Sequence, residues 1–594
     1  MRYRLATIVL ALSVALPGVT TAAEEPASFE ALIDEVGRVM LARHPEEVTD
    51  LGLGDALGLD DRSLNDLSPE YRAGTAALAQ DQLDRLATVE RTTLTTDERV
   101  TLATAEWYLQ DIVTMHEFAD HDYAVNFVTG AHANFPEFMA DIHPLADLDD
   151  AEGFVARLQA GGEQLRQVSD NLRRSEAAGV LPTERGLAIA DWQIANQVRQ
   201  ASGHPILADL ADRLAATKLD EADAEAILDR AEVALADELL PAYTELQRAV
   251  GASATRSDRE PGVLYHPDGA AYYETVLAHH LSMPLTPTEV HETGLAEVER
   301  VRDELEVAMA ELGIDVERLG FAGAIEAVGS LVPAVPLTSS ADREALLADT
   351  EAFVAEASEA FADMFTTSPA SPIEVQRPRP GREGAGGAYY RPPPASGERP
   401  GIYYLALGGN TFPMDTYATT NYHEAVPGHH FQLALQRESE ELPLLQRATG
   451  FTGYAEGWAL YAERLAAEAG LYEDDSLGDI GRLRMELLRA ARAVADTGIH
   501  AFDWSRDEAI AYLVGLGLPE GWAASEVDRY IVWPGQAPAY LIGMLEILRL
   551  RDEAQAALGD DFDLAGFHDA VLRHGSVPLA VLPMAVEAWV ESFR

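Results

Sequence analysis

From residue 28 to about residue 365, apolar residues recur at intervals of three and four positions. This spacing puts them on one face of an α-helix and leaves Asp, Glu and Arg on the other face. The pattern is clearest in residues 29–41, 98–115, 224–240 and 341–364. Helix starts are marked by capping boxes, which pair Thr95 with Glu98, Thr286 with Glu289, and Ser505 with Glu508. We therefore expect an all-α fold.

The helical pattern breaks between residues 366 and 413, where prolines and glycines are frequent. Within this region, residues 387–391 and 401–407 (GIYYLAL) are rich in Tyr and are separated by Pro and Gly, which predicts a small β-hairpin. Helical periodicity returns at about Thr419 and continues to Arg594. No repeat or long linker is evident, so residues 24–370 and 371–594 are predicted to be two lobes of one unit.

The charge of the chain excludes a nucleic-acid binder. Its 594 residues contain 99 Asp and Glu against 43 Lys and Arg, a formal charge of −56 that could not neutralise a phosphate backbone. Lys218 is the only lysine. Such a surface repels itself at low salt and tolerates molar salt, where charges are screened within a few ångströms, so we expect a halophilic or salt-tolerant source.

The N-terminus has the layout of a secretory signal. Arg2 and Arg4 precede an apolar run over residues 5–19, and small residues lead to Glu24, so residues 1–23 are predicted to be a signal peptide. The run is too short to span a membrane comfortably and contains Pro17. The chain contains no Cys, which excludes disulfides, thiolate metal sites and lipid attachment through a thiol. We expect a periplasmic or secreted protein without a membrane anchor after signal cleavage.

Residues 423–430 (HEAVPGHH) resemble the beginning of a zinc-binding helix. In the H-E-x-x-H signature, two His one turn apart bind zinc and the Glu polarises the bound water. Here Pro427 occupies the second His position, and the next histidines are His429 and His430. Pro427 cannot donate to the carbonyl of His423, so the helix should kink there and could bring His429 to the metal. We favour His429, since His430 on a straight helix would lie about 10 Å along the axis.

A catalytic zinc site needs a third protein ligand. Glu456 is the best candidate, because it follows His429 by 27 residues, enough for a helix, a turn and an antiparallel return. Its neighbours Ala455, Gly457 and Ala459 are small, as close helix approach at a buried ion requires. Glu463, two turns later, is an alternative ligand or a residue that orients one.

The sequence resembles the bacterial domain-of-unknown-function 885 family, which is predicted to comprise secreted zinc metallopeptidases of the Glu-zincin type. The resemblance lies in HEAVPGHHFQ (423–432), AEGWALYAE (455–463), DGAAYY (268–273), DTGIH (496–500) and EVDRYIVWPGQAPAYLIGML (526–545). It implies a two-lobed helical metallopeptidase-like fold with the hairpin beside an active-site cleft. It further implies Zn²⁺ bound by His423, His429 and Glu456, with Glu424 as the catalytic base.

Further roles are expected by analogy with helical zinc peptidases. His500, Tyr530 and Tyr540 are candidate donors to the oxyanion of the tetrahedral intermediate. Arg492 and Arg529 are candidates to hold a substrate carboxylate, although Arg492 could instead pair with Asp496, four residues on.

The predicted strand over residues 402–407 contains Tyr404 and ends at Gly408-Gly409-Asn410. It could pair with an extended peptide through main-chain hydrogen bonds, which makes Tyr404 and Asn410 candidate substrate contacts.

The sequence therefore predicts a zinc metallopeptidase that hydrolyses peptides or oligopeptides. One alternative is a zinc hydrolase of the same geometry that acts on a non-peptide amide or ester. The other is a secreted helical binding protein without catalytic activity. Metal content distinguishes the binding protein from the two hydrolases, and a substrate profile distinguishes the hydrolases from each other.

Overall fold

The structure is a computed structural model that describes residues 28–594, except for residues 201–202, 258–260 and 380–386. The fold is mostly helical and includes two small sheets. The predicted signal peptide lies outside the described residues. Among the helices that are described, none combines the length and apolar character needed to cross a membrane.

The helices up to residue 311 are α1 (Phe29–Leu41), α2 (Pro45–Leu51), α3 (Gly54–Leu57), α4 (Pro69–Leu86), α5 (Thr96–His116), α6 (Ala131–Glu137), α7 (Leu148–Ala177), α8 (Glu184–Arg199), α9 (Pro205–Ala216), α10 (Glu221–Ala234), α11 (Leu240–Ala254), α12 (Gly269–Leu281) and α13 (Pro287–Glu311). The later helices are α14 (Val316–Leu319), α15 (Phe321–Gly329), α16 (Ser340–Ala360), α17 (Tyr417–Glu424), α18 (His429–Glu438), α19 (Leu444–Ala448), α20 (Thr452–Glu468), α21 (Ser476–Ala501), α22 (Arg506–Gly515), α23 (Glu520–Val532), α24 (Ala539–Leu558), α25 (Leu564–Leu572) and α26 (Leu582–Glu591). The strands are β1 (Ala334–Pro336), β2 (Ile373–Gln376), β3 (Ala388–Arg391), β4 (Gly401–Leu405) and β5 (Thr411–Pro413). Short 3-10 or π segments are η1 (Arg91–Thr93), η2 (Phe138–Ile142), η3 (Leu235–Leu239), η4 (Val263–Tyr265), η5 (Ala362–Met364) and η6 (Gly559–Asp561).

The helix signals in the sequence correspond closely to the structure. The first predicted helix, residues 29–41, is α1 with the same bounds. All three predicted capping boxes form at the starts of α5, α13 and α22, where Thr or Ser accepts from the Glu backbone and the Glu carboxylate accepts in return. One prediction differs in detail, because residues 224–240 form α10 followed by the π turn η3 before α11 begins. Local capping chemistry thus sets these helix starts.

The predicted hairpin is present but is part of a larger sheet. β3 and β4 pair antiparallel, and β2 adds to the other edge of β4 in parallel, which gives the order β2-β4-β3. A second, two-stranded sheet joins β1 to β5 in antiparallel register. The sequence pattern did not predict β1, β2 or β5, each of which has four residues or fewer.

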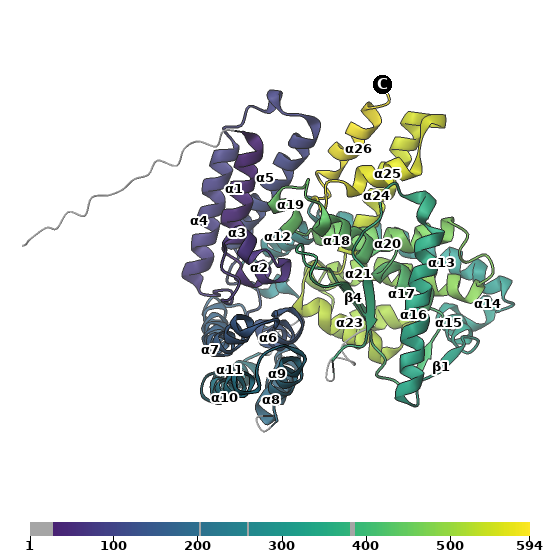
Figure 1. Cartoon of the computed structure of the whole chain (residues 1–594). Coiled ribbons are helices and arrows are strands. Elements are labelled where there is room, and N and C mark those ends of the chain that lie inside the picture. Colours follow the sequence, from purple (N-terminus) through teal and green to yellow (C-terminus); the bar gives the residue numbers. More distant parts are fainter. Residues whose placement is uncertain (1–27, 201–202, 258–260, 380–386) are drawn as a thin grey trace, which may run out of the picture.

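Several hydrophobic clusters support the fold. The largest contains mainly residues between 263 and 590, whereas a second one is formed by helices α6 to α11 and a third by α1, α4 and α5. Figure 1 shows α1, α4 and α5 side by side, with α7 to α11 next to them and α17, α18 and α20 toward the middle of the molecule. The boundary at residue 370, predicted between two lobes, stays a prediction.

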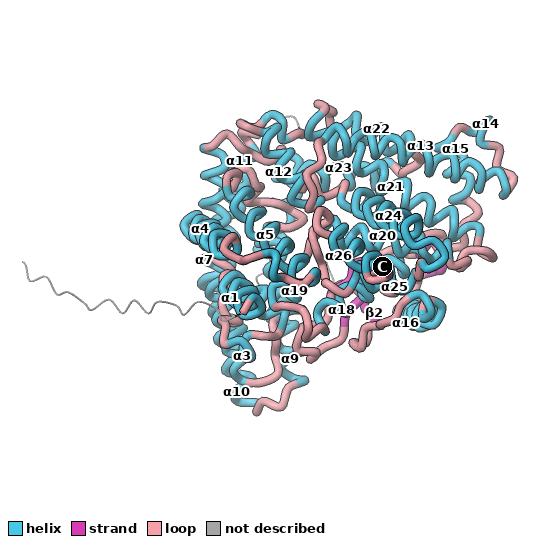
Figure 2. The backbone as a smooth tube through the Cα atoms, turned by 90° about the horizontal axis from the view of Figure 1, so that it is seen from above, coloured by secondary structure: helices cyan, strands magenta, loops and turns pink. Residues whose placement is uncertain are grey.

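Helices α20 and α24 pack unusually closely, and they lie beside each other in Figure 2. A Cβ at Gly457 would lie 2.4 Å from the Cα of Gly543, and one at Gly543 would lie 1.9 Å from the carbonyl oxygen of Gly453. Only glycine permits such backbone contact. The small residue at position 457 therefore serves this helix contact, and the expected explanation by a nearby ion is not needed for it.

Candidate metal centre

The segment HEAVPGHH does not form one bent helix. Helix α17 ends at Glu424, residues 425–428 form a connection with a cis Val426–Pro427 peptide, and α18 begins at His429. Gly428 is required by close packing, since a Cβ there would lie 1.9 Å from the carbonyl oxygen of His423. Proline and glycine thus produce a complete break, where the sequence predicted a kink.

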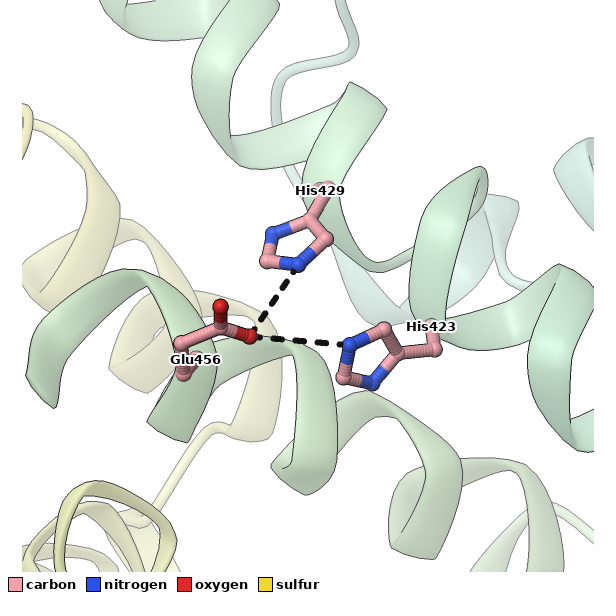
Figure 3. A group of neighbouring side chains, drawn as sticks. All are labelled: His423, His429 and Glu456. Carbon is pink, nitrogen blue, oxygen red and sulfur yellow. Dashed lines mark ion pairs between the residues drawn. The ribbon is translucent and has the colours of Figure 1, made fainter. Parts of the chain in front are cut away.

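The break brings the three predicted ligands together. His423 is on the last turn of α17, His429 is the first residue of α18, and Glu456 is on α20. The Oε2 atom of Glu456 lies 3.7 Å from Nε2 of His423 and 3.4 Å from Nε2 of His429. One ligand atom from each residue lies within 4.8 Å of the others, and the three side chains converge in Figure 3. We call these residues the His-His-Glu cluster.

His430, the alternative to His429, points elsewhere. Its side chain is buried, and its Nδ1 atom lies 2.8 Å from the hydroxyl of Tyr390 on β3. Burial lowers the pKa of His430 to about 4, so the ring is neutral at physiological pH. His430 therefore joins α18 to the edge of the three-stranded sheet, as the preference for His429 over His430 implies.

A buried carboxylate orients the first predicted ligand. Nδ1 of His423 lies 2.8 Å from Oε1 of Glu463, and the hydroxyl of Thr419 donates to Oε2 at 2.6 Å. Arg489 lies 3.3 Å from the same carboxylate. Burial alone would raise the pKa of Glu463, but Arg489 and His423 outweigh it and hold the pKa below its ordinary value. Of the two roles considered for Glu463, this geometry matches the orienting one, with Nε2 of His423 directed at the cluster.

The cluster has the properties of a cation site. Oε2 of Glu456 is buried and has no hydrogen-bond partner in the described part of the chain. Its nearest partners are the two imidazoles at ion-pair distance, and a buried carboxylate oxygen without a hydrogen bond is stabilised when a cation binds it. Two His with one Glu form a known donor set for catalytic zinc. The side chains of His429 and Glu456 keep exposures of 13% and 20%, so solvent reaches part of the cluster.

Glu424, the predicted base, directly follows His423 at the end of α17. It is buried, and burial raises the pKa of its carboxyl above the ordinary value, against the opposing charges of His423 and His429. The residue is thus held next to the cluster by the same turn of helix that holds the first predicted ligand.

Tyr540 and Tyr530 differ in their distance from the cluster. The ring of Tyr540 stacks against that of His423 at 6.3 Å between centroids. The hydroxyl of Tyr530 instead donates to Oε2 of Glu526 at 2.8 Å, and Tyr530 is buried. Tyr540 is therefore the one of the two that contacts a predicted ligand.

His500 is a correction to the sequence analysis. Its Nδ1 accepts from the backbone N–H of Val263 at 3.2 Å, and its Nε2 donates to the carbonyl oxygen of Tyr530 at 3.0 Å. The ring is fully buried and stacks on Tyr273. Because both ring nitrogens are bonded to the backbone, His500 stabilises the core and cannot donate to a substrate oxyanion.

The two predicted carboxylate-binding arginines share one acidic partner that the sequence analysis missed. Arg492 lies 2.8 Å from Glu526, and Arg529 lies 3.9 Å from it. The alternative pairing of Arg492 with Asp496 is wrong, since Asp496 accepts from the hydroxyl of Tyr273 and the N–H of Gly535. Glu526 lies three residues before Arg529 on α23, so local spacing could have indicated that pair, whereas Arg492 is 34 residues away from Glu526 in the chain, too far for local spacing to indicate it.

The predicted substrate contacts on the hairpin need correction. β4 is the central strand and is paired on both edges, so it cannot add a peptide strand there. Tyr404 stacks on Tyr389 at 4.7 Å, whereas its neighbour Tyr403 donates to Oδ1 of Asn421 on α17 at 2.7 Å. Asn410 is exposed beyond β4, and its carbonyl accepts from Leu337. Tyr403, not Tyr404, thus faces the helix that carries His423.

Known structures share this fold. A crystal structure of a lipoprotein candidate from Colwellia psychrerythraea is 29% identical, covers 95% of this chain and 99% of its own, and superimposes with a TM-score of 0.89. A lipoprotein candidate of unknown function from Shewanella oneidensis is 18% identical, covers 94% of this chain and 99% of its own, and has a TM-score of 0.70. No protein with curated function matches the sequence significantly.

A family model gives the assignment. The model described as "Bacterial protein of unknown function (DUF885)" matches residues 45–586, which include every helix from α2 to α25 and the whole His-His-Glu cluster. The chain therefore belongs to the DUF885 family of bacterial proteins of unknown function.

Proposed function

We propose that this protein is a zinc-dependent hydrolase of peptide bonds. The observation that carries the proposal is the His-His-Glu cluster, in which a buried oxygen of Glu456 that forms no hydrogen bond within the described residues faces the Nε2 atoms of His423 and His429. Glu424, adjacent in sequence to the first ligand, supplies a carboxylate at the position of the base in zinc peptidases. Glu463 supports the same interpretation, since metal-binding His residues usually bond a carboxylate through their other nitrogen.

The chemistry follows from these groups. A zinc ion held by His423, His429 and Glu456 would lower the pKa of water toward about 7 and polarise a substrate carbonyl. Glu424 would accept the proton of the attacking water and deliver it to the leaving amine. Tyr540, whose ring lies against His423, is the remaining candidate to donate to the developing oxyanion.

We also propose that the fold is a two-lobed, metallopeptidase-like one, with the cluster facing a cleft between the lobes. The separate hydrophobic clusters of the N-terminal helices support this division. The predicted signal peptide and the lipoprotein candidates among the similar structures support export to the cell envelope or beyond.

The test combines metal content with hydrolysis. Elemental analysis of the purified protein should find one zinc per chain, and a peptide library should be cut only without a chelator. Glu424→Gln should abolish cleavage and keep zinc, whereas His423→Ala or Glu456→Ala should lose zinc. His430→Ala is the matched control and should keep zinc, because His430 bonds Tyr390.

Two results would refute parts of this proposal. Absence of stoichiometric zinc, with activity unaffected by Glu424→Gln, would favour the binding-protein alternative. Zinc-dependent cleavage of esters or non-peptide amides, with peptides untouched, would retain the site and replace the substrate class.

A further inference from the structure

Beside the His-His-Glu cluster lies a group of charged side chains whose net charge is positive, on a chain whose total charge is −56. Arg492 is bonded to Glu526 through Nε at 2.9 Å, and Arg529 lies on the other side of the same carboxylate. Burial alone would raise the pKa of Glu526, but Arg492 and Arg529 outweigh it and lower it to about 2. Two permanent cations thus surround one carboxylate.

The neighbouring Asp496 does not cancel the excess positive charge of Arg492 and Arg529 below neutral pH. Burial raises the pKa of Asp496 to about 7, even though Tyr273 and Gly535 donate hydrogen bonds to it. At pH 6 its carboxyl is mostly protonated, so it leaves the excess charge of the two arginines in place.

The two arginines differ in how far they are engaged. Arg492 is buried, with 9% of its side chain exposed, and it donates to Glu526 through Nε while a second nitrogen lies 2.8 Å from the same oxygen. Arg529 keeps 21% exposure, lies at 3.9 Å from Glu526, donates one hydrogen bond to Oε1 of Gln536, and rests over the ring of Trp533. Arg529 is therefore the more accessible of the two arginines, and the donors that Gln536 does not use remain for a ligand, with Glu526 and Gln536 holding the guanidinium in place.

Tyr540 connects this group to the cluster. The guanidinium of Arg492 lies 5.0 Å from the centroid of the Tyr540 ring, whose other neighbour is the ring of His423 at 6.3 Å. An extended chain advances about 3.5 Å per residue. The path from the ring of His423 through Tyr540 to the guanidinium of Arg492 is thus about 11 Å at most, the length of about three extended residues, and Arg529 lies on the other side of the Glu526 carboxylate.

We propose that Arg529, supported by Arg492 and Glu526, binds the C-terminal carboxylate of the substrate, so that the enzyme removes one to three residues from the C-terminus of a peptide. This inference rests on the proposed hydrolase function and names its substrate class. A guanidinium binds a carboxylate with two parallel hydrogen bonds, which a C-terminal amide cannot match.

The experiment compares two peptides that differ only at the C-terminus. An N-acetylated Ala–Leu hexapeptide is prepared as the free acid and as the amide. Both are titrated calorimetrically at pH 6 into the zinc-loaded Glu424→Gln protein, and both are incubated with the wild type and analysed by mass spectrometry. The free acid should bind about 10- to 100-fold more tightly, the range expected for hydrogen bonds to charged groups.

Variants assign the effect to the site. Arg529→Gln in the same background should reduce the affinity ratio of acid to amide to near one and leave amide binding unchanged. Arg302→Gln is the matched control, since Arg302 is a surface arginine with 47% exposure that pairs with Glu306. Arg529 is chosen over Arg492, whose buried ion pair supports the fold, and thermal melting checks that each variant is folded.

The outcomes separate the two proposals. Equal binding of acid and amide, or cleavage in the middle of both peptides, overturns the carboxylate site and leaves a metal-dependent hydrolase. Absence of any cleavage argues against the hydrolase. The ratio of the affinities for the acid and the amide, and its loss in Arg529→Gln, still decide whether Arg529 binds a carboxylate.

Discussion

Replacing Asp496 by Asn should make the protein less sensitive to alkaline pH. Asp496 is fully buried on α21, and burial raises the pKa of its carboxyl from 3.8 to about 7. The folded state therefore holds a proton that the unfolded state releases between these values, and the stability due to this group is lost as pH rises from about 4 to about 7. The substitution keeps an oxygen to accept from Tyr273 and Gly535 but carries no charge.

The magnitude follows from the two pKa values. Their difference of about 3 corresponds to about 4 kcal/mol, of which about 3 kcal/mol is lost between pH 5 and pH 8. With an unfolding entropy of about 2 cal/mol/K per residue, this equals a shift of about 2 °C in Tm for a chain of this length.

Calorimetric melting of both proteins at pH 5 and pH 8, in the same molar salt, measures this shift. At each pH, the Tm of the wild type is subtracted from the Tm of Asp496→Asn. This difference should be about 2 °C larger at pH 8 than at pH 5. Glu526→Gln is the control, because the pKa of Glu526 is lowered to about 2. The contribution of Glu526 to the free energy of unfolding is therefore nearly constant above pH 5, and this substitution should change Tm by the same amount at both pH values. If the difference for Asp496→Asn is the same at both pH values, the carboxyl is not protonated in the folded protein and the reasoning fails.

Two further predictions concern the cluster and the surface. Glu463→Gln should weaken zinc binding by about 10- to 100-fold, because His423 loses the carboxylate that orients it. Competition with a chromophoric chelator measures the zinc affinity, and an unchanged affinity would show that Glu463 has no orienting role. Raising KCl from 0.1 M to 2 M should raise the Tm of the protein by several degrees, because salt screens the net charge of −56. A Tm that does not change with salt would contradict a halophilic origin.

Features set by neighbours in the sequence were predictable. Capping boxes depend on residues three positions apart, so the starts of α5, α13 and α22 were predicted from the sequence. The preference for His429 over His430 also came from neighbouring residues, although the sequence predicted a kink at Pro427 and the break needs Gly428 as well.

Features set by distant partners were not predictable. Alternation along β4 shows that one of two adjacent tyrosines faces α17, but Tyr403 and Tyr404 are identical in type and the pattern cannot distinguish them. The four-residue rule favoured Asp496 as the partner of Arg492, whereas packing of α23 against α21 brings Glu526 closer. A buried His such as His500 has the same sequence signature as a catalytic one, and only its two backbone partners reveal the difference.

The backbone contact between α20 and α24 limits how the site can move. Glu456 precedes Gly457 in the chain, and Tyr540 lies three residues before Gly543, so both side chains project from helices that touch at these glycines. With no side chain to rearrange between them, the two helices must shift as one rigid body. An opening motion that admits a long substrate must therefore come from other elements. The backbone amide protons of α20 and α24 should exchange with solvent at the same slow rate.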